Sequence, residues 1–262
     1  MKITVMSFNL RYDKPDPGVR QWKKRVGAIA SVIQHYKPDI IGTQEGKLNQ
    51  LEDLQALLPE YGIIGGDRTG TGQGEHCAIF YNPQFLKLQQ TKDFFLSDTP
   101  EIPGSITWGT RLPRMATWAN FELGNSGLSL TILNTHLDHE SPKARELGAA
   151  LITQYLAAFD PKSHLLLMGD FNANPSSPSR QIFLSPLTNG KQLQDALAVL
   201  PLEQQKTFHD FTGEARDAID TIYFDPDLQL EQVKIDNQQW EGVWPSDHFP
   251  VIVKLTIVSS FE

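Results

Sequence analysis

Short apolar segments rich in β-branched and aromatic residues recur along the chain, and each of them predicts a strand. They occupy residues 3–8, 40–43, 78–81, 116–121, 128–133, 165–168, 219–224 and 251–258. Apolar residues at helical spacing occupy residues 21–35 and 143–159, and a shorter candidate helix covers residues 49–58. Pro38 and Pro161 closely follow the first two of these segments, and helices commonly end before a proline.

The order of these elements predicts α/β layers. Residues 116–121 and 128–133 flank a turn-forming stretch at residues 124–127, so they predict an antiparallel hairpin. A mixed two-sheet sandwich flanked by helices accommodates both features. The chain has no repeat and no linker long enough to separate two folding units, so we expect one domain over residues 1–262.

Two segments predict long loops. Residues 65–74 contain five glycines and predict a mobile loop, and residues 97–114 predict a long irregular segment. Long loops inside compact domains are often functional, so both segments are candidates for lining a site.

The composition is typical of a water-soluble globular chain, with 40% hydrophobic and 21% charged residues. The 23 Lys and Arg against 31 Asp and Glu give a formal net charge of −8, which repels polyanions such as nucleic acids and anionic membranes. No apolar run is long enough to cross a bilayer. The first apolar stretch is too short for a signal peptide, and the lone Cys77 cannot form an internal disulfide, so we expect a cytoplasmic protein.

Polar and acidic residues follow the predicted strands, which is where a sheet presents side chains to a cleft. Asn9 follows residues 3–8, and Glu45 follows residues 40–43. Taken alone, Asn9 is more commonly a turn residue, and Glu45 fits a carboxylate at a helix start equally well. Neither residue assigns a function without the others.

Two further groups follow the strands in the middle of the chain. Residues 134–139 contain His136 and His139 with a carboxylate between them, a density that favours function over an ordinary loop. Asp170 and Asn172 follow the apolar residues 165–168 and face the same side of an extended chain. An aspartate and an asparagine at this spacing also suit a turn.

The last groups lie near the end of the chain. Asp220 interrupts an apolar strand, and a buried carboxylate needs a partner such as a histidine. Asp247 and His248 precede the final strand, although that adjacency can be coincidental. Together, the carboxylates suit a hard cation such as Mg²⁺ or Mn²⁺, and the single cysteine argues against a thiolate zinc site. The histidines and amides can contact phosphate, so the whole set predicts metal-assisted hydrolysis of a phosphate ester.

These motifs, in this order, resemble the endonuclease/exonuclease/phosphatase superfamily over nearly the whole chain. The matching pieces are SFNLRYD, IIGTQE, LNTHLDH, LMGDFNANP, DAIDTIYF and WPSDHFPV. The resemblance implies a four-layer α/β sandwich, with two mixed β-sheets packed face to face and helices outside. It also implies a single active site at one edge of the sandwich.

The resemblance further implies roles for the individual residues. Glu45 looks like the main metal ligand, with Asn9 and Asp247 close by. Asp170 resembles the residue that positions or activates the attacking water, and Asn172 resembles one that holds the phosphate.

The histidines receive roles in the same way. His248 resembles the histidine that contacts the scissile phosphate, with Asp220 as its orienting carboxylate. His136 stands where relatives carry a general acid near the leaving group. Arg11 stands where nucleases of the exonuclease III type carry an acidic residue, which weakens the case for a second metal.

The substrate is predicted from charge and from candidate binding residues. Arg111 and Arg114 suit bidentate phosphate binding, Trp108 and His209 could stack on a base or a sugar, and His139 is a further candidate. The basic residues near the start of the first helix could contact phosphates, although a solvated helix start is their more ordinary role: Arg11, Lys14, Arg20, Lys23, Lys24 and Arg25. The net charge and the lack of a long basic stripe favour a small ester such as a sugar phosphate or nucleotide. A nuclease acting on DNA or RNA is the alternative, and no membrane or obligate protein partner is expected.

Overall fold

The chain forms two mixed six-stranded sheets, which the computed structural model describes for residues 1–257. The first sheet has the order β11-β12-β1-β2-β4-β3 and the second has the order β5-β6-β7-β8-β10-β9. The strands of the first sheet are β11 (Leu228–Ile235), β12 (Val251–Ile257), β1 (Lys2–Asn9), β2 (Ile40–Gln44), β4 (Ile79–Tyr81) and β3 (Gly62–Ile64). Those of the second are β5 (Leu86–Phe95), β6 (Met115–Leu123), β7 (Ser129–His136), β8 (His164–Asp170), β10 (Asp220–Phe224) and β9 (Gln194–Asp195).

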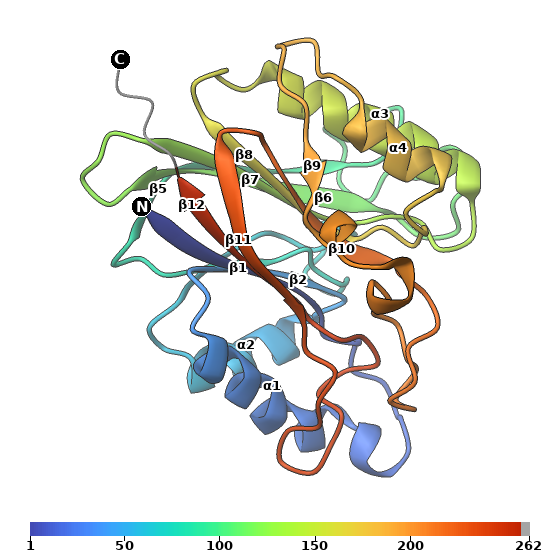
Figure 1. Cartoon of the computed structure of the whole chain (residues 1–262). Coiled ribbons are helices and arrows are strands. Elements are labelled where there is room, and N and C mark those ends of the chain that lie inside the picture. Colours follow the sequence, from blue (N-terminus) through green and yellow to red (C-terminus); the bar gives the residue numbers. More distant parts are fainter. Residues whose placement is uncertain (258–262) are drawn as a thin grey trace.

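Four helices cover the outer faces of the two sheets. Helices α1 (Trp22–Tyr36) and α2 (Leu48–Leu57) lie on the first sheet, and α3 (Pro142–Ala158) and α4 (Pro178–Leu184) lie on the second, giving four layers (Figure 1). Short 3₁₀ helices occupy Gly18–Arg20, Ala196–Val199 and Leu202–Gln204. The observed architecture is the predicted four-layer α/β sandwich.

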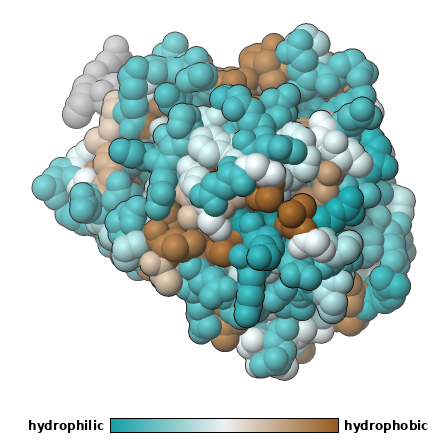
Figure 2. Space-filling model, turned by 90° about the horizontal axis from the view of Figure 1, so that it is seen from below, coloured by the Kyte–Doolittle hydropathy of each residue, from teal (hydrophilic) through white to brown (hydrophobic). Residues whose placement is uncertain are grey.

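Alternating side chains separate the buried layers. Val5 packs between the two sheets, whereas the next residue, Met6, packs under α1 and α2. In the second sheet Leu166 faces the other sheet, and Leu167 packs under α3 and α4. Strands buried on both faces explain why the inner strands have continuous apolar sequences. The outer face that carries α1 and α2 is mostly hydrophilic, interrupted by a few hydrophobic patches (Figure 2).

Each sheet contains one parallel pair of strands joined by a helix. In the first sheet α1 connects β1 to its parallel neighbour β2, and in the second α3 connects β7 to its parallel neighbour β8. Across the interface, β1 and β2 face β8. The carboxyl ends of these four strands therefore meet at one rim of the sandwich.

The structure confirms all eight predicted strands and all three predicted helices within the described residues, although Val258 of the last predicted strand lies outside them. The hairpin is confirmed, because β6 and β7 pair antiparallel around residues 124–127. Strands β3, β5, β9 and β11 and helix α4 were not predicted. Residues 65–74 and 97–114 form no helix or strand, as expected, but the mobility of the first segment stays a prediction.

Candidate active site

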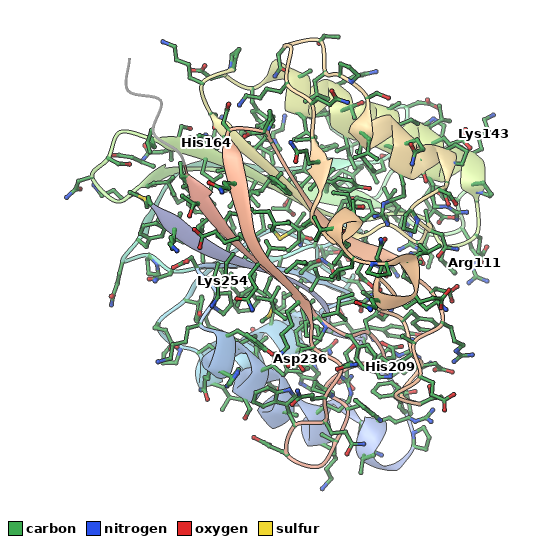
Figure 3. All side chains as sticks on the ribbon, in the orientation of Figure 1. Arg111, Lys143, His164, His209, Asp236 and Lys254 are labelled. Carbon is green, nitrogen blue, oxygen red and sulfur yellow. The ribbon has the colours of Figure 1, made fainter. Side chains whose placement is uncertain are left out.

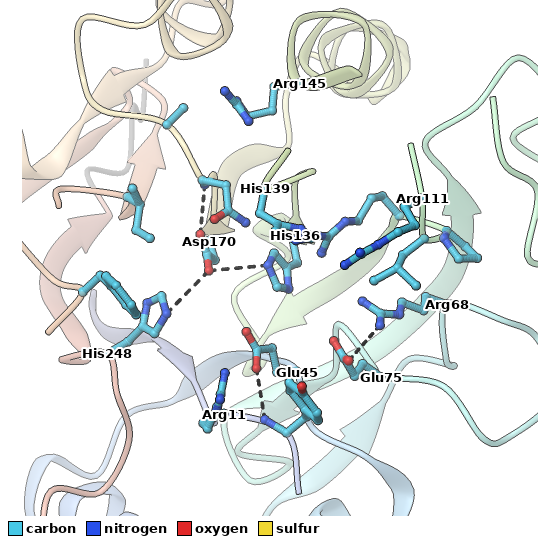
Figure 4. A pocket seen from close by; sticks show the side chains of 18 of the residues that line it. Arg11, Glu45, Arg68, Glu75, Arg111, His136, His139, Arg145, Asp170 and His248 are labelled. Carbon is cyan, nitrogen blue, oxygen red and sulfur yellow. Dashed lines mark hydrogen bonds and ion pairs between the residues drawn. The ribbon is translucent and has the colours of Figure 1, made fainter. Parts of the chain in front are cut away.

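The four converging strands deliver the central residues of the site. Asn9, His136 and Asp170 are the last residues of β1, β7 and β8, and Glu45 directly follows β2. In the register of the second sheet His136 lies beside Asp170. Residues from four distant parts of the sequence thus share one rim, and Figure 4 shows Glu45, His136 and Asp170 there.

A polar network fixes the two sheets to one another directly behind these residues. The Gln44 amide donates to the side-chain oxygen of Asn134 at 2.7 Å, and the Asn134 amide donates to the carbonyl oxygen of Thr43 at 2.8 Å. All three residues are fully buried. Buried polar groups that hydrogen-bond across the interface restrict its geometry, so Glu45 and His136 project from a rigid support.

The backbone at this rim departs from ordinary conformations. Glu45 and Asn172 have φ values of 65° and 48°, a region that residues other than glycine adopt rarely. Gly169 has φ of 155°, and a Cβ there would lie 2.1 Å from the Thr135 carbonyl oxygen. Residues in such conformations cluster at functional sites because the surrounding structure must hold them there.

The carboxylates of Glu45 and Asp170 lie close together at the centre of the rim. The Asn9 amide nitrogen donates to both, to Glu45 Oε1 at 3.1 Å and to Asp170 Oδ2 at 3.0 Å. Each carboxylate also accepts one backbone N–H, from Tyr12 to Glu45 and from Asn172 to Asp170. The structure therefore gives Asn9 the role of joining two carboxylates, while its side-chain oxygen accepts from the Arg11 N–H.

His248 and Asp220 form a buried pair beside this centre. The His248 Nδ1–H donates to Asp220 Oδ2 at 2.8 Å, and the Thr207 hydroxyl donates to the same oxygen at 2.6 Å. The other ring nitrogen of His248 faces Asp170 Oδ2 at 3.9 Å. Asp220 thus holds the imidazole with its other nitrogen toward the acidic centre.

Two of the basic residues around the start of α1 have different roles. Arg11 approaches Asp247, with Nη1 3.5 Å from Oδ2, and so places a cation inside the acidic centre. Arg25 is fully buried and donates to the carbonyl oxygens of Leu10, Arg11, Arg20 and Pro245. Arg25 therefore holds the loops in place and is not available to a substrate.

The buried charges shift one another's protonation. Burial and the neighbouring Asp220 and Glu45 carboxylates raise the pKa of Asp170 to about 7. Burial and Glu45 also raise the pKa of Asp247. The pKa of Glu45 is lowered because His248 and the hydrogen bonds from Tyr12 and Asn9 outweigh its burial. Carboxylates that destabilise one another's charge form a site that a cation would relieve.

The two histidines at the centre are shifted in opposite directions. Burial alone would lower the pKa of His248, but the Asp220 carboxylate raises it well above its ordinary value. Burial and the Arg114 and Arg68 cations lower the pKa of His136 well below its ordinary value, although its Nε2 lies 3.5 Å from Asp170. His248 is therefore the charged imidazole and His136 the neutral one.

The donor atoms at this rim fit a hard metal ion. An oxygen of Glu45, an oxygen of Asp170 and a ring nitrogen of His248 all lie within 4.8 Å of one another. Because His248 is charged and bound to Asp220, the carboxylates are the better ligands. These acidic groups could hold a metal ion.

A cavity of about 840 Å³ opens over this centre. Arg111, Arg114 and His139 line it, together with the predicted central residues Glu45, His136, Asp170, Asn172, Asp247 and His248. Arg114 is buried and engaged with Asp138 at 3.3 Å and with His139 at 2.6 Å, whereas Arg111 is exposed and lies 3.2 Å from Glu140. Of the two arginines, Arg111 is the freer to move toward a ligand.

Two predicted substrate residues do not line the cavity. His209 is fully buried, stacked on Phe249 with ring centroids 3.9 Å apart, and accepts the Gly213 N–H. Trp108 lies on the irregular segment and donates to Asp98 at 2.6 Å. Both side chains anchor their own loops, and the structure does not place them for stacking on a base or a sugar.

The cavity also contains residues that the sequence did not single out. They are Tyr12, Lys47, Arg68, Glu75, Arg145, Asn174, Ser177, Phe208 and Asp217, among others. Tyr12, Asn174 and Asp217 lie within the matched pieces SFNLRYD, LMGDFNANP and DAIDTIYF, but the others lie outside all of the motifs. The glycine-rich segment at residues 65–74 was the one signal that pointed toward Arg68, because long loops often line functional sites.

The sandwich and its acidic, histidine-bearing cavity define a phosphoesterase. The chain belongs to the endonuclease/exonuclease/phosphatase family, whose model matches residues 6–248. Two solved structures illustrate the likeness. A mannosyl-6-phosphatase of Bacteroides thetaiotaomicron is 32% identical, with a TM-score of 0.88 over 97% of this chain and 99% of the other. A family protein of Bacteroides vulgatus is 29% identical, with a TM-score of 0.90 over 98% and 100%.

Two curated relatives are more distant, and one of them is named a probable RNA exonuclease. Nocturnin of Drosophila melanogaster is 24% identical over 92% of this chain, and a probable RNA exonuclease of Saccharomyces cerevisiae, NGL3, is 25% identical over 68%. The chain spans 43% and 39% of these two proteins' own lengths. Members of the family are phosphoric ester hydrolases. In the part of the chain that the structure describes, no helix has the length and apolarity to cross a membrane.

Proposed function

We propose that the protein is a divalent-metal-dependent phosphatase that hydrolyses a small phosphate ester, either a sugar phosphate or a nucleotide. The observation that carries the proposal is the cluster of Glu45, Asp170 and Asp247 on the floor of a cavity with arginines on its walls. The carboxylates suit a metal ion, and the arginines suit the oxygens of one phosphate group bound to that ion. The 32% identity to a mannosyl-6-phosphatase supports a small ester.

Glu45 and Asp247 would hold Mg²⁺ or Mn²⁺, since hard cations prefer carboxylate oxygens. Asp170 would stay free to act on the attacking water. When bound, the ion would neutralise charge that develops on the phosphate oxygens. Arg11 already neutralises part of Asp247, which favours one ion over two.

The chain's own residues supply the remaining steps of hydrolysis. The charged His248 donates a hydrogen bond to a phosphate oxygen, held in orientation by Asp220. Asp170, with its pKa raised to about 7 by burial and Asp220, accepts a proton as water attacks phosphorus. The bond from phosphorus to the ester oxygen then breaks, and the leaving oxygen takes up a proton from solvent.

Asn172 and His136 position the phosphate and the leaving group. Asn172 donates to the Leu137 carbonyl oxygen at 3.0 Å, which fixes its amide beside the cavity. The neutral His136 can donate a hydrogen bond to the leaving oxygen, and its lowered pKa favours this role over transfer of a proton. We infer that the predicted general acid acts mainly by hydrogen bonding.

Nuclease activity is the second candidate, supported by the relative named a probable RNA exonuclease. A screen with Mg²⁺ or Mn²⁺ over phosphomonoesters, single-stranded and duplex oligonucleotides separates the two functions. We expect the highest kcat/KM on a sugar phosphate or nucleotide, with activity lost in excess chelator. A higher kcat/KM on an oligonucleotide would replace the phosphatase proposal with the nuclease, and full activity in chelator would contradict metal dependence.

A further inference from the structure

One wall of the cavity carries an ion pair that the phosphate chemistry does not use. The Arg68 guanidinium and the Glu75 carboxylate lie 2.7 Å apart, and both side chains are mostly buried yet line the cavity. The same two residues also pair through the backbone, where the Arg68 N–H donates to the Glu75 carbonyl oxygen at 2.9 Å. Figure 4 shows the pair on the side of Arg111 and across the centre from His248.

The loop that carries this pair is held in one shape by Asp67. Its carboxylate accepts the backbone N–H groups of Thr69, Gly72 and Gly74 as well as the Thr69 hydroxyl. These hydrogen bonds lower the pKa of Asp67 to about 2, although its burial acts in the opposite direction. The carboxylate therefore stays ionised and keeps all of its acceptor sites at neutral pH.

The loop is also fixed relative to the metal-binding centre. The His76 N–H, next to Glu75, donates to the Gly46 carbonyl oxygen at 2.8 Å, and Gly46 directly follows Glu45. A small recess of about 10 Å³ is lined by Glu45, Glu75 and His136, together with Arg68 and Arg114. That volume suits about one water or one hydroxyl group. The pair thus stands beside His136, on the side where the alcohol would leave.

The chemistry of the pair selects the kind of leaving group. A guanidinium offers only donors and a carboxylate only acceptors, so together they match hydroxyl groups, which do both. Burial raises the pKa of Glu75 to about 7. Above that pH the pair has no net charge, and its carboxylate would repel a second phosphate. Among residues 1–257, Tyr12 and Phe208 are the only Phe, Tyr or Trp side chains that line the cavity, which gives a base little surface to stack on.

We propose that Arg68 and Glu75 determine specificity by binding hydroxyl groups of a sugar on the leaving-group side of the phosphate. The inference rests on the proposed phosphatase function and narrows its substrate to a sugar phosphate. A site built to hydrogen-bond a hydroxyl strongly discriminates against an analogue that lacks it, because the buried polar groups are then left unpaired.

The test compares esters that share the phosphate and differ in the leaving group. We would measure kcat and KM on mannose 6-phosphate, glucose 6-phosphate and p-nitrophenyl phosphate for the wild type, Glu75→Gln and Arg68→Lys. Both variants should raise KM for the better hexose phosphate about tenfold to a hundredfold, as expected for lost hydrogen bonds to a charged group. Activity on p-nitrophenyl phosphate should stay within about twofold, which also reports correct folding. Glu60→Gln, at an exposed glutamate in a turn, is the matched control and should change kcat and KM for neither kind of substrate.

Each other outcome overturns the inference. Equal losses on both kinds of ester would show that the pair serves the metal centre or the fold, and no loss on either would show that it has no role in binding. A wild type that hydrolyses p-nitrophenyl phosphate but neither hexose phosphate would overturn the sugar inference and leave the phosphatase in place. If the wild type hydrolyses neither these monoesters nor a nucleotide, the proposed function fails as well.

Discussion

Strands β8 and β10 carry buried charges at both of their ends, but the two ends are built differently. At one end Asp170 and Asp220 lie side by side in the register of the sheet. At the other end Asp225 lies beside His164, with 3.9 Å between Oδ1 and Nδ1, and Lys191 donates to the second Asp225 oxygen at 2.8 Å. His164 lies on the opposite side of the molecule from the cavity residue Arg111 (Figure 3).

The difference lies in what compensates the carboxylates. At the far end the Lys191 ammonium is buried within reach of Asp225 and 3.1 Å from Asp227, so the protein supplies its own cation. His164, Asp225 and Asp227 have the spacing of a metal site, but the lysine already neutralises them. At the cavity, the carboxylates gain only partial compensation, from His248 and from Arg11, which lies 3.5 Å from Asp247. A buried acidic cluster is thus a better candidate for binding a metal when its internal cations compensate its carboxylates only in part.

The largest effect is expected from Glu45→Gln, which removes the carboxylate whose pKa is lowered and which is therefore reliably charged. We expect kcat/KM to fall about a thousandfold, or about 4 kcal/mol, because the remaining carboxylates hold a hard cation poorly. The free energy of unfolding should decrease slightly, because the lowered pKa means that the folded state favours the charged carboxylate. Steady-state kinetics with added Mn²⁺ and thermal unfolding measure both quantities, and undiminished activity would contradict the assignment.

A smaller effect, on stability alone, is expected from Lys191→Met at the far end of β8 and β10. The change leaves Asp225 buried without its cation, which should cost about 3 kcal/mol of unfolding free energy. Activity at a permissive temperature should stay within about twofold. Asp227→Asn is the control, because its side chain is 59% exposed and an exposed partner contributes under about 1 kcal/mol. Loss of activity in folded Lys191→Met would mean that the two ends are not independent.

A coupling of about 1–2 kcal/mol is expected between His248 and Asp220. Asp220 accepts from the ring nitrogen and raises the pKa of the imidazole, so removing either group should remove most of the other's contribution. A double-mutant cycle of kcat/KM with His248→Ala and Asp220→Asn measures the coupling. Fully additive losses would show that the carboxylate does not act through the histidine.

The pKa values of two buried imidazoles should be shifted in opposite directions. Burial against apolar groups lowers the pKa of His209 from 6.5 to about 4, whereas the Asp220 carboxylate raises that of His248 well above 6.5. By nuclear magnetic resonance, His248 should stay protonated at about pH 8 and His209 neutral at about pH 5.5. The unfolded chain binds a proton on His209 more readily, so this residue's contribution to stability is present above pH 6.5 and decreases as the pH falls toward 4. Replacing His209 with Gln should flatten that pH dependence, and an unchanged profile would contradict the shift.

The smallest effect is expected from salt. For a small ester bound through one phosphate, kcat/KM should change less than about threefold between about 50 and about 200 mM salt. For a polymer with several phosphates neutralised by the protein, kcat/KM should fall by orders of magnitude over the same range. The measurement is a salt series on the best small ester and on a short oligonucleotide. A steep slope on a preferred oligonucleotide would favour the nuclease.

The sequence predicted the inner strands and missed the edges of the sheets for a physical reason. All residues of β8 are buried, so its apolar run is continuous, and the sequence shows it plainly. Strands β5 and β11 lie at sheet edges and expose many side chains, so sequences such as KLQQTKD lack an apolar pattern. Helix α4 has only seven residues, too few for a clear helical period.

The sequence predicted those residues of the candidate site that lie at the ends of strands. Asn9, Glu45, His136 and Asp170 meet because parallel strands present their carboxyl ends at one rim. Side-chain direction was not predictable, and His209 turned inward onto Phe249. The Arg68–Glu75 pair could not be predicted from the sequence either, because it depends on the loop shape that Asp67 holds.

Binding of Mn²⁺ tests most directly whether the partly compensated carboxylates form the metal centre. Isothermal titration calorimetry on the wild type, Glu45→Gln and Asp227→Asn compares the cavity with the cluster around Lys191. We expect Glu45→Gln to weaken binding at least about tenfold and Asp227→Asn to leave it unchanged. Equal affinity in the wild type and Glu45→Gln, or weakened binding in Asp227→Asn, would contradict the assignment of the metal to the cavity.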